Sequence, residues 1–75
     1  MPIKVLICDP IHQDGVKLLR DAGFEVTEKT KITKEELLTE AKSFEVIVVR
    51  GRTKITSEVI AAATLLKAVA RSGVG

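Results

Sequence analysis

The chain has 75 residues, of which 45% are apolar and 29% are charged, and its formal net charge is +2. This length allows one small domain, because a short chain buries only about 60% of the surface that it exposes when unfolded. The charges alternate in sign and aromatic residues are few, so the sequence lacks the basic clusters and stacking rings of a nucleic-acid surface. Its apolar runs are too short for a signal peptide or a membrane span. A single cysteine without a targeting segment predicts a cytoplasmic protein.

Three elements are predicted in the first third of the chain. Residues 5–8 form a continuous apolar run, which predicts a strand covered on both faces. Apolar residues at helical spacing predict a helix over residues 12–22, and Gly23 is a typical helix stop. Residues 24–27 alternate between apolar and polar, which predicts a strand with one exposed face at a sheet edge. The apolar positions of the helix are Gly15, Leu18, Leu19 and Ala22.

The second helix has a specific start signal. Thr33 and Glu36 have the spacing of a capping box, and Ile32 and Leu37 have the spacing of a hydrophobic staple. We therefore expect a helix from this point to about Lys42.

The last third of the chain predicts a strand, a helix and another strand. Residues 46–49 are a second continuous apolar run, and residues 67–70 form the last strand. Thr56 is a typical N-cap for the helix between them. The stripe of this helix that we expect to be buried consists of Val59, Ala62, Ala63 and Leu66.

The alternation of strands and helices predicts a parallel α/β sheet. Strands joined by helical crossovers run parallel, and the crossovers are right-handed. The first and third strands are apolar throughout and belong inside, whereas the alternating second strand belongs at an edge. The sequence therefore predicts a flavodoxin-like sheet of strand order 2-1-3-4 in a three-layer α/β/α arrangement. A complete sheet of this kind would have a fifth strand beside the fourth, so the sheet is expected to be cut short.

In such a sheet, ligands bind beyond the carboxyl ends of the strands, near the switch in strand order. Residues 9–12, 50–52 and 71–75 all fall at that edge. Arginine side chains match carboxylate and phosphate oxygens, and consecutive backbone N–H groups converge on anions, so the sequence predicts an anion site. Arg50 follows a buried strand directly, where a charge needs a partner, whereas Arg71 fits a structural ion pair equally well. The turn Gly73-Val74-Gly75 supplies the N–H groups.

Other kinds of site find less support. His12 is expected at the surface of a helix start, and Cys8 is expected to act as a small buried hydrophobe. No metal-ligand spacing occurs, and no G-x-G-x-x-G follows a strand, so the chain has no dinucleotide site of its own. A signalling receiver domain would share the fold and an acid such as Asp9, but it needs an aspartate where this chain has Arg50. A free-standing anion-binding module stays open.

The segments IKVLICDPIHQDGVKLLRDAGFEV, VIVVRGRTKIT and LLKAVARSGVG resemble the N-terminal part of D-2-hydroxyacid dehydrogenases. The resemblance covers the whole chain. It implies a two-domain, NAD-dependent oxidoreductase in which residues 1–75 are the N-terminal portion of the substrate-binding domain. The NAD-binding Rossmann domain and the catalytic residues would lie outside this chain, so that the chain alone is inactive.

The resemblance also implies a substrate and its contacts. It is strongest to the members that oxidise 3-phosphoglycerate in serine biosynthesis, and glyoxylate or hydroxypyruvate reductases are the alternative. Arg50 matches the arginine that reaches the phosphate end of the substrate, and Gly51 stands where serine is common. Gly73, Val74 and Gly75 match the loop that holds the substrate carboxylate, with N–H groups of the last two as donors. The implied protein is a homodimer or homotetramer that binds a small phosphorylated 2-hydroxy acid.

Overall fold

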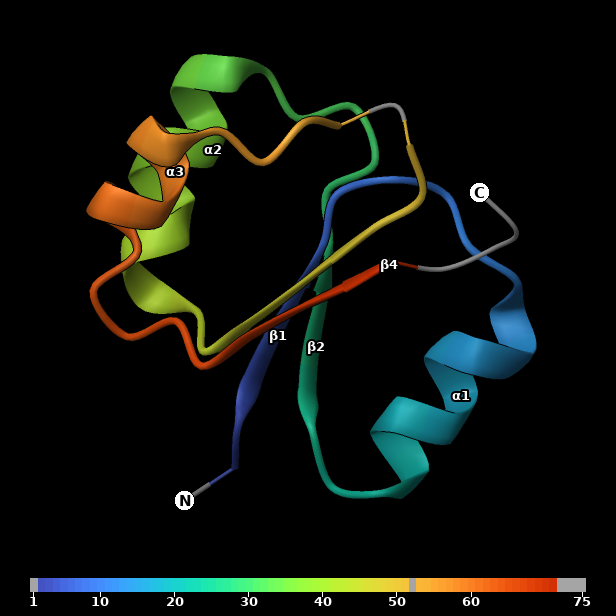
Figure 1. The fold of residues 1–75 in the computed structure, drawn as a ribbon. Helices are drawn as coiled ribbons and strands as arrows, with labels where there is room; N and C mark the ends of the chain where they lie inside the picture. Colours follow the sequence, from blue (N-terminus) through green and yellow to red (C-terminus); the bar gives the residue numbers. More distant parts are fainter. Residues whose placement is uncertain (1, 52, 72–75) are drawn as a thin grey trace.

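The computed structural model describes residues 2–51 and 53–71. Strands and helices alternate along the chain (Figure 1). In order, they are β1 (Lys4–Ile7), α1 (Gln13–Asp21), β2 (Glu25–Glu28), α2 (Lys34–Glu40), the 3₁₀ turn η1 (Ala41–Ser43), β3 (Val46–Val49), α3 (Ser57–Ala62) and β4 (Ala68–Arg71). Strands β1, β2 and β4 are displaced by one residue from the predicted ranges, and β3 coincides with its range.

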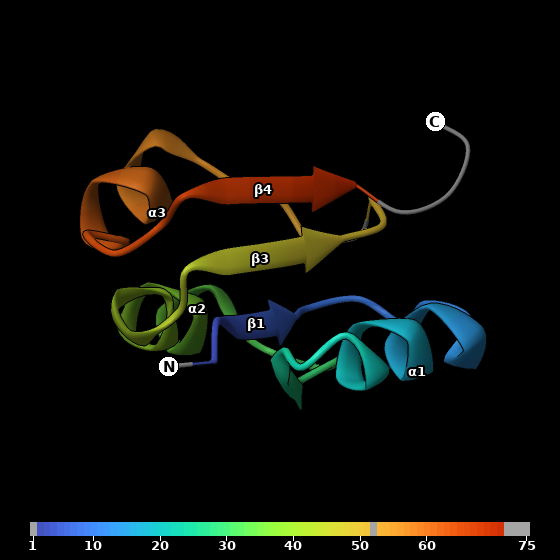
Figure 2. The same ribbon diagram turned by 90° about the horizontal axis from the view of Figure 1, so that it is seen from below.

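The four strands form one parallel sheet in the order β2-β1-β3-β4, which confirms the predicted topology. Figure 2 shows β1, β3 and β4 side by side and pointing the same way. Helices α2 and α3 lie on one side of the sheet and α1 lies on the other (Figure 1). The molecule therefore has the three layers of a flavodoxin-like fold.

The two faces of the sheet carry separate parts of the core. Side chains of a strand alternate between faces, so Leu6 and Ile47 pack toward α2 and α3, whereas Ile7 and Val48 pack toward α1. The strand residues 5–7 are at most 1% exposed. This burial on both faces explains why β1 and β3 are apolar at every inner position.

The predicted buried side of α1 is partly wrong. Val16 is the buried residue of this helix, and Leu19 packs partly against the same cluster. Leu18, which we expected to be buried, is 72% exposed. Two residues along a helix correspond to about 200° around its axis, so Leu18 points away once Val16 faces the sheet.

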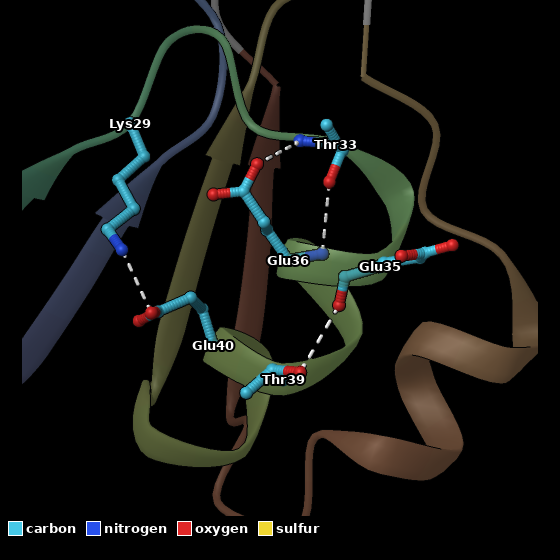
Figure 3. A network of polar contacts seen from close by, with 6 residues as sticks. All are labelled: Lys29, Thr33, Glu35, Glu36, Thr39 and Glu40. Carbon is cyan, nitrogen blue, oxygen red and sulfur yellow. Dashed lines mark hydrogen bonds and ion pairs between the residues drawn. The ribbon is translucent and has the colours of Figure 1, made fainter.

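The start of α2 confirms the predicted capping box. The Glu36 backbone N–H donates to Thr33 Oγ1 at 3.2 Å, and the Thr33 backbone N–H donates to Glu36 Oε1 at 3.2 Å (Figure 3). Leu37 is buried and Ile32 packs against its cluster, as the staple spacing indicates. Near the other end of the helix, Lys29 Nζ lies 2.8 Å from Glu40 Oε1.

Helix α3 is shorter than its apolar stripe suggested. Thr56 caps it, since Thr56 Oγ1 accepts from the Val59 N–H. The helix ends at Ala62 because Ala63 has a non-helical ψ of 70°. Ala63 is nevertheless buried and Leu66 packs against the same cluster. The prediction that these two residues belong to the core is therefore confirmed, although both lie beyond the end of the helix.

The last strand stands at the edge of the sheet. All four residues of β4 are exposed, and Val69 keeps 43% of its surface accessible. The other strands are thus enclosed in the fold to a greater degree than β4. In the described ranges, none of the helices has the length and apolar character needed to cross a bilayer.

Candidate functional site

The carboxyl ends of β1 and β3 are joined by the side chain of Asp9. Asp9 follows β1 at a position that is 1% exposed. Its Oδ2 accepts the backbone N–H of Arg50 at 2.8 Å and that of Gly51 at 3.1 Å. Its Oδ1 accepts the backbone N–H of Thr53 at 3.0 Å and the Thr53 hydroxyl at 2.6 Å. The two segments predicted to share an edge of the sheet are therefore held together by one carboxylate.

The ionisation of Asp9 and Cys8 follows from this packing. Burial alone would raise the pKa of Asp9, but the hydrogen bonds from the Thr53 hydroxyl and from the loop N–H groups lower it to about 2. Burial, with a further effect of the Asp9 charge, raises the pKa of the Cys8 thiol to about 11. Cys8 is thus a buried neutral thiol, as expected from its apolar strand.

The depressed pKa of Asp9 makes part of the stability depend on pH. The pKa is about 2 in the folded protein and 3.8 ordinarily, so about 2 kcal/mol of stability should be present above pH 4 and lost as the pH falls toward 2. Urea unfolding at pH 7, 4 and 2.5 measures this loss. Asp9→Asn should remove the dependence, whereas Asp21→Asn, at an exposed position, should retain it. An equal acid response in all three proteins would contradict the assignment.

Arg50 and Arg71 both lie at this edge. Arg50 is exposed, so the argument that burial demands a partner for its charge is wrong. No carboxylate of the described residues forms an ion pair with either arginine. The Arg71 side chain lies close to the loop after β3. A Cβ atom added to Gly51 in that loop would be 3.8 Å from Arg71 Nη2. The structural ion pair considered for Arg71 is therefore absent from the described part of the chain.

A hollow of about 320 Å³ opens between the ends of β3 and β4. Its lining combines cationic, hydroxyl and apolar side chains with the backbone of a glycine. The lining residues are Val49, Gly51, Thr53, Lys54, Ile55, Val69 and Arg71. Since Lys54 and Arg71 supply positive charge and the hollow is small, its chemistry suits a small organic anion.

Two of the remaining predicted residues lie within the described part of the chain, and the others lie outside it. His12 is at the surface and caps α1, because its Nδ1 accepts the Asp14 N–H at 3.1 Å. Lys54 is exposed, as expected, although it lines the hollow. Gly73, Val74 and Gly75 lie outside the described residues, as does Arg52. Their assignment to an anion site stays a prediction.

The backbone conformation at residue 51 favours glycine. Its φ is +130°, a conformation that residues with a Cβ rarely adopt. Serine, which the family resemblance suggested as common here, would be strained in this loop. We expect Gly51→Ser to destabilise the protein by about 1–3 kcal/mol, measured by urea unfolding. Gly15→Ser, in helical backbone with ordinary space around it, should change stability by less than about 1 kcal/mol. Equal effects would refute the explanation.

Sequence reasoning missed what Asp9 and Thr53 do together. The sequence places Asp9 at the ligand edge of the sheet and offers it as an acid shared with receiver domains, and it predicts no role for Thr53. The available signal was an acidic residue directly after a fully buried strand, since such a carboxylate needs hydrogen-bond donors. The donors here are mostly backbone N–H groups, which a residue pattern does not display.

The family of the chain follows from comparison with known proteins. Residues 5–75 match the family model described as D-isomer specific 2-hydroxyacid dehydrogenase, catalytic domain. The chain belongs to this family.

Among curated proteins, the chain is similar to D-3-phosphoglycerate dehydrogenases. It is 48% identical over 73 residues to the enzyme of Methanocaldococcus jannaschii and 44% identical over 72 residues to that of Homo sapiens. These matches cover 97% and 96% of the chain. The chain spans 14% of the length of each of these two relatives.

Solved structures show the same relationship. A protein from Pyrococcus horikoshii superposes with a TM-score of 0.86 at 28% identity, over 95% of this chain and 21% of its own. The NAD⁺-bound 3-phosphoglycerate dehydrogenase of Entamoeba histolytica superposes with a TM-score of 0.78 at 31% identity, over 100% of this chain and 27% of its own. The α/β sheet of order 2-1-3-4 is thus a dehydrogenase domain fold.

Proposed function

We propose that this chain is the N-terminal portion of the substrate-binding domain of an NAD-dependent D-3-phosphoglycerate dehydrogenase. The complete enzyme would oxidise 3-phosphoglycerate to 3-phosphohydroxypyruvate for serine biosynthesis in the cytoplasm, as a homodimer or homotetramer. The observation that carries the proposal is the 44–48% identity, over nearly the whole chain, to curated enzymes of that name.

The chain's own residues would bind and orient the substrate. Arg50 would pair with the phosphate end, and the N–H groups of Gly73, Val74 and Gly75 would hold the carboxylate. The positive charge of Arg71 beside the Gly51 backbone supports an anionic ligand at this edge. Holding the substrate at both ends fixes its C2 hydroxyl relative to the reacting partners, which is how positioning lowers a barrier.

NAD and the groups that transfer protons belong to the rest of the enzyme in this proposal. NAD, when bound, accepts the hydride from C2 of the substrate. The turn after β1 reads CDPIHQDG and has no glycine-rich phosphate loop, so it does not fit a dinucleotide. The chain alone is therefore expected to be inactive.

The test is an NADH-formation assay on the complete enzyme. We expect oxidation of 3-phosphoglycerate to proceed with a far higher kcat/KM than that of unphosphorylated D-glycerate. Efficient NADH-dependent reduction of glyoxylate or hydroxypyruvate without 3-phosphoglycerate oxidation would instead support a reductase of the same family. Calorimetry on the 75-residue chain provides the second arm: tight binding of 3-phosphoglycerate would favour a free-standing anion-binding module.

A further inference from the structure

Asp9 is a buried acid to which the proposed function assigns no role. It stands at the end of β1 and reaches Arg50, Gly51 and Thr53, which lie 41–44 residues further along the chain. Its carboxylate accepts hydrogen bonds from the backbone N–H groups of these three residues and from the Thr53 hydroxyl. A buried carboxylate with such donors keeps its charge by ordering the backbone that supplies them.

The bonds to Asp9 Oδ2 act on Arg50 in particular. The N–H of Arg50 precedes the Arg50 Cα atom, and the N–H of Gly51 follows it. Both donate to the same oxygen, at 2.8 and 3.1 Å. Because the peptide units on the two sides of one Cα are fixed, both backbone dihedrals of Arg50 are fixed as well. The direction in which the Arg50 side chain leaves the loop is therefore set by Asp9.

Thr53 holds the other oxygen of the same carboxylate. Its hydroxyl lies 2.6 Å from Asp9 Oδ1 and 3.3 Å from the carbonyl oxygen of Cys8. The Thr53 backbone N–H lies 3.0 Å from each oxygen of Asp9. The carboxylate is thus prevented from rotating, and its Oδ2 stays aimed at the two N–H groups that flank Arg50.

We infer that Asp9 is a positioning residue that sets the affinity for the phosphate end of the substrate by fixing the backbone of Arg50. The inference rests on the proposed function, in which Arg50 contacts the phosphate. A guanidinium gives a strong bidentate interaction only when its planar fork meets the oxygens correctly. A misdirected Arg50 would keep its charge and lose that geometry.

The test compares Asp9→Asn with wild type in the complete enzyme. The asparagine amide replaces one acceptor oxygen with an NH₂ donor, which would face the N–H donors of the loop, so the loop loses part of its restraint. We expect KM for 3-phosphoglycerate to rise about tenfold, while kcat and KM for NAD change less than about twofold. Asp21→Asn, the same change at an exposed position in α1, should leave all three constants unchanged.

A double-mutant cycle separates positioning from general damage. If Asp9 acts through Arg50, Asp9→Asn should raise KM less than about twofold when Arg50 is already alanine. An equal rise in both backgrounds would overturn the inference. So would a folded Asp9→Asn enzyme with a normal KM.

Variants at Thr53 decide the matter if Asp9→Asn does not fold. Thr53→Val removes the hydroxyl at similar volume and should raise KM about threefold, and Thr53→Ser should restore it. A normal KM in Thr53→Val would count against the inference. Failure of the proposed function looks different, because the wild-type enzyme would then not oxidise 3-phosphoglycerate at all.

Discussion

Alanine in place of Arg50 is expected to raise KM for 3-phosphoglycerate by about ten- to hundredfold in the complete enzyme. A hydrogen bond to a charged group contributes about 1.5–3 kcal/mol, and each 1.4 kcal/mol corresponds to a factor of about ten. The contact would be made at the phosphate, away from the reacting carbon, and therefore equally in the ground and transition states. Such a loss appears in KM and leaves kcat nearly unchanged.

Steady-state kinetics with two substrates makes this expectation specific. D-Glycerate lacks the phosphate, so its KM should be insensitive to Arg50→Ala. Arg20→Ala is the matched control, since Arg20 lies on α1, pairs with Glu28 at 3.4 Å and does not line the hollow. A parallel rise for both substrates, or no rise for either, would remove Arg50 from the phosphate contact.

The second large effect concerns the core rather than the site. Leu6→Ala should destabilise the protein by about 3–5 kcal/mol, because Leu6 is 0% exposed at the centre of β1 and its removal leaves a cavity. Domains are stable by only about 5–15 kcal/mol in total. The loss would therefore take a large share of the stability of a chain this small.

Leu18→Ala is the control for that experiment. It deletes the same atoms from a side chain that is 72% exposed, so urea unfolding should show a change below about 1 kcal/mol. Comparable losses in the two variants would mean that Leu6 does not occupy the packed centre of the sheet.

Much of the fold was predictable because burial in a parallel sheet leaves a direct record in the sequence. The runs at 5–8 and 46–49 are apolar at consecutive positions, as strands covered on both faces require. The start of α2 was predictable for a local reason, since the side chains of Thr33 and Glu36 each accept a hydrogen bond from the backbone N–H of the other residue. The choice between Val16 and Leu18 was not local, because the sheet decides which side of an isolated helix is covered.

The candidate site was predictable only in part. The topology brings the residues after β1 and β3 to one edge, and Arg50 was placed there correctly. The link through Asp9 could not be read from residue types, because its donors are largely N–H groups that every residue except proline carries. The exposure of Arg50 also depends on the path of the loop after β3. The predicted carboxylate-binding turn at residues 73–75 lies outside the described residues.

The burial of Cys8 makes this residue a reporter of transient opening of the core. It is the single cysteine of the chain, it is 1% exposed, and its pKa is about 11. Alkylating reagents attack the thiolate, so at neutral pH this residue should be labelled only when the core around it opens. Cys8 packs in the cluster that also contains Leu37 and Val59, so the rate of modification should follow transient opening of the core between the sheet and helices α2 and α3. Mass spectrometry can measure this rate without any added probe.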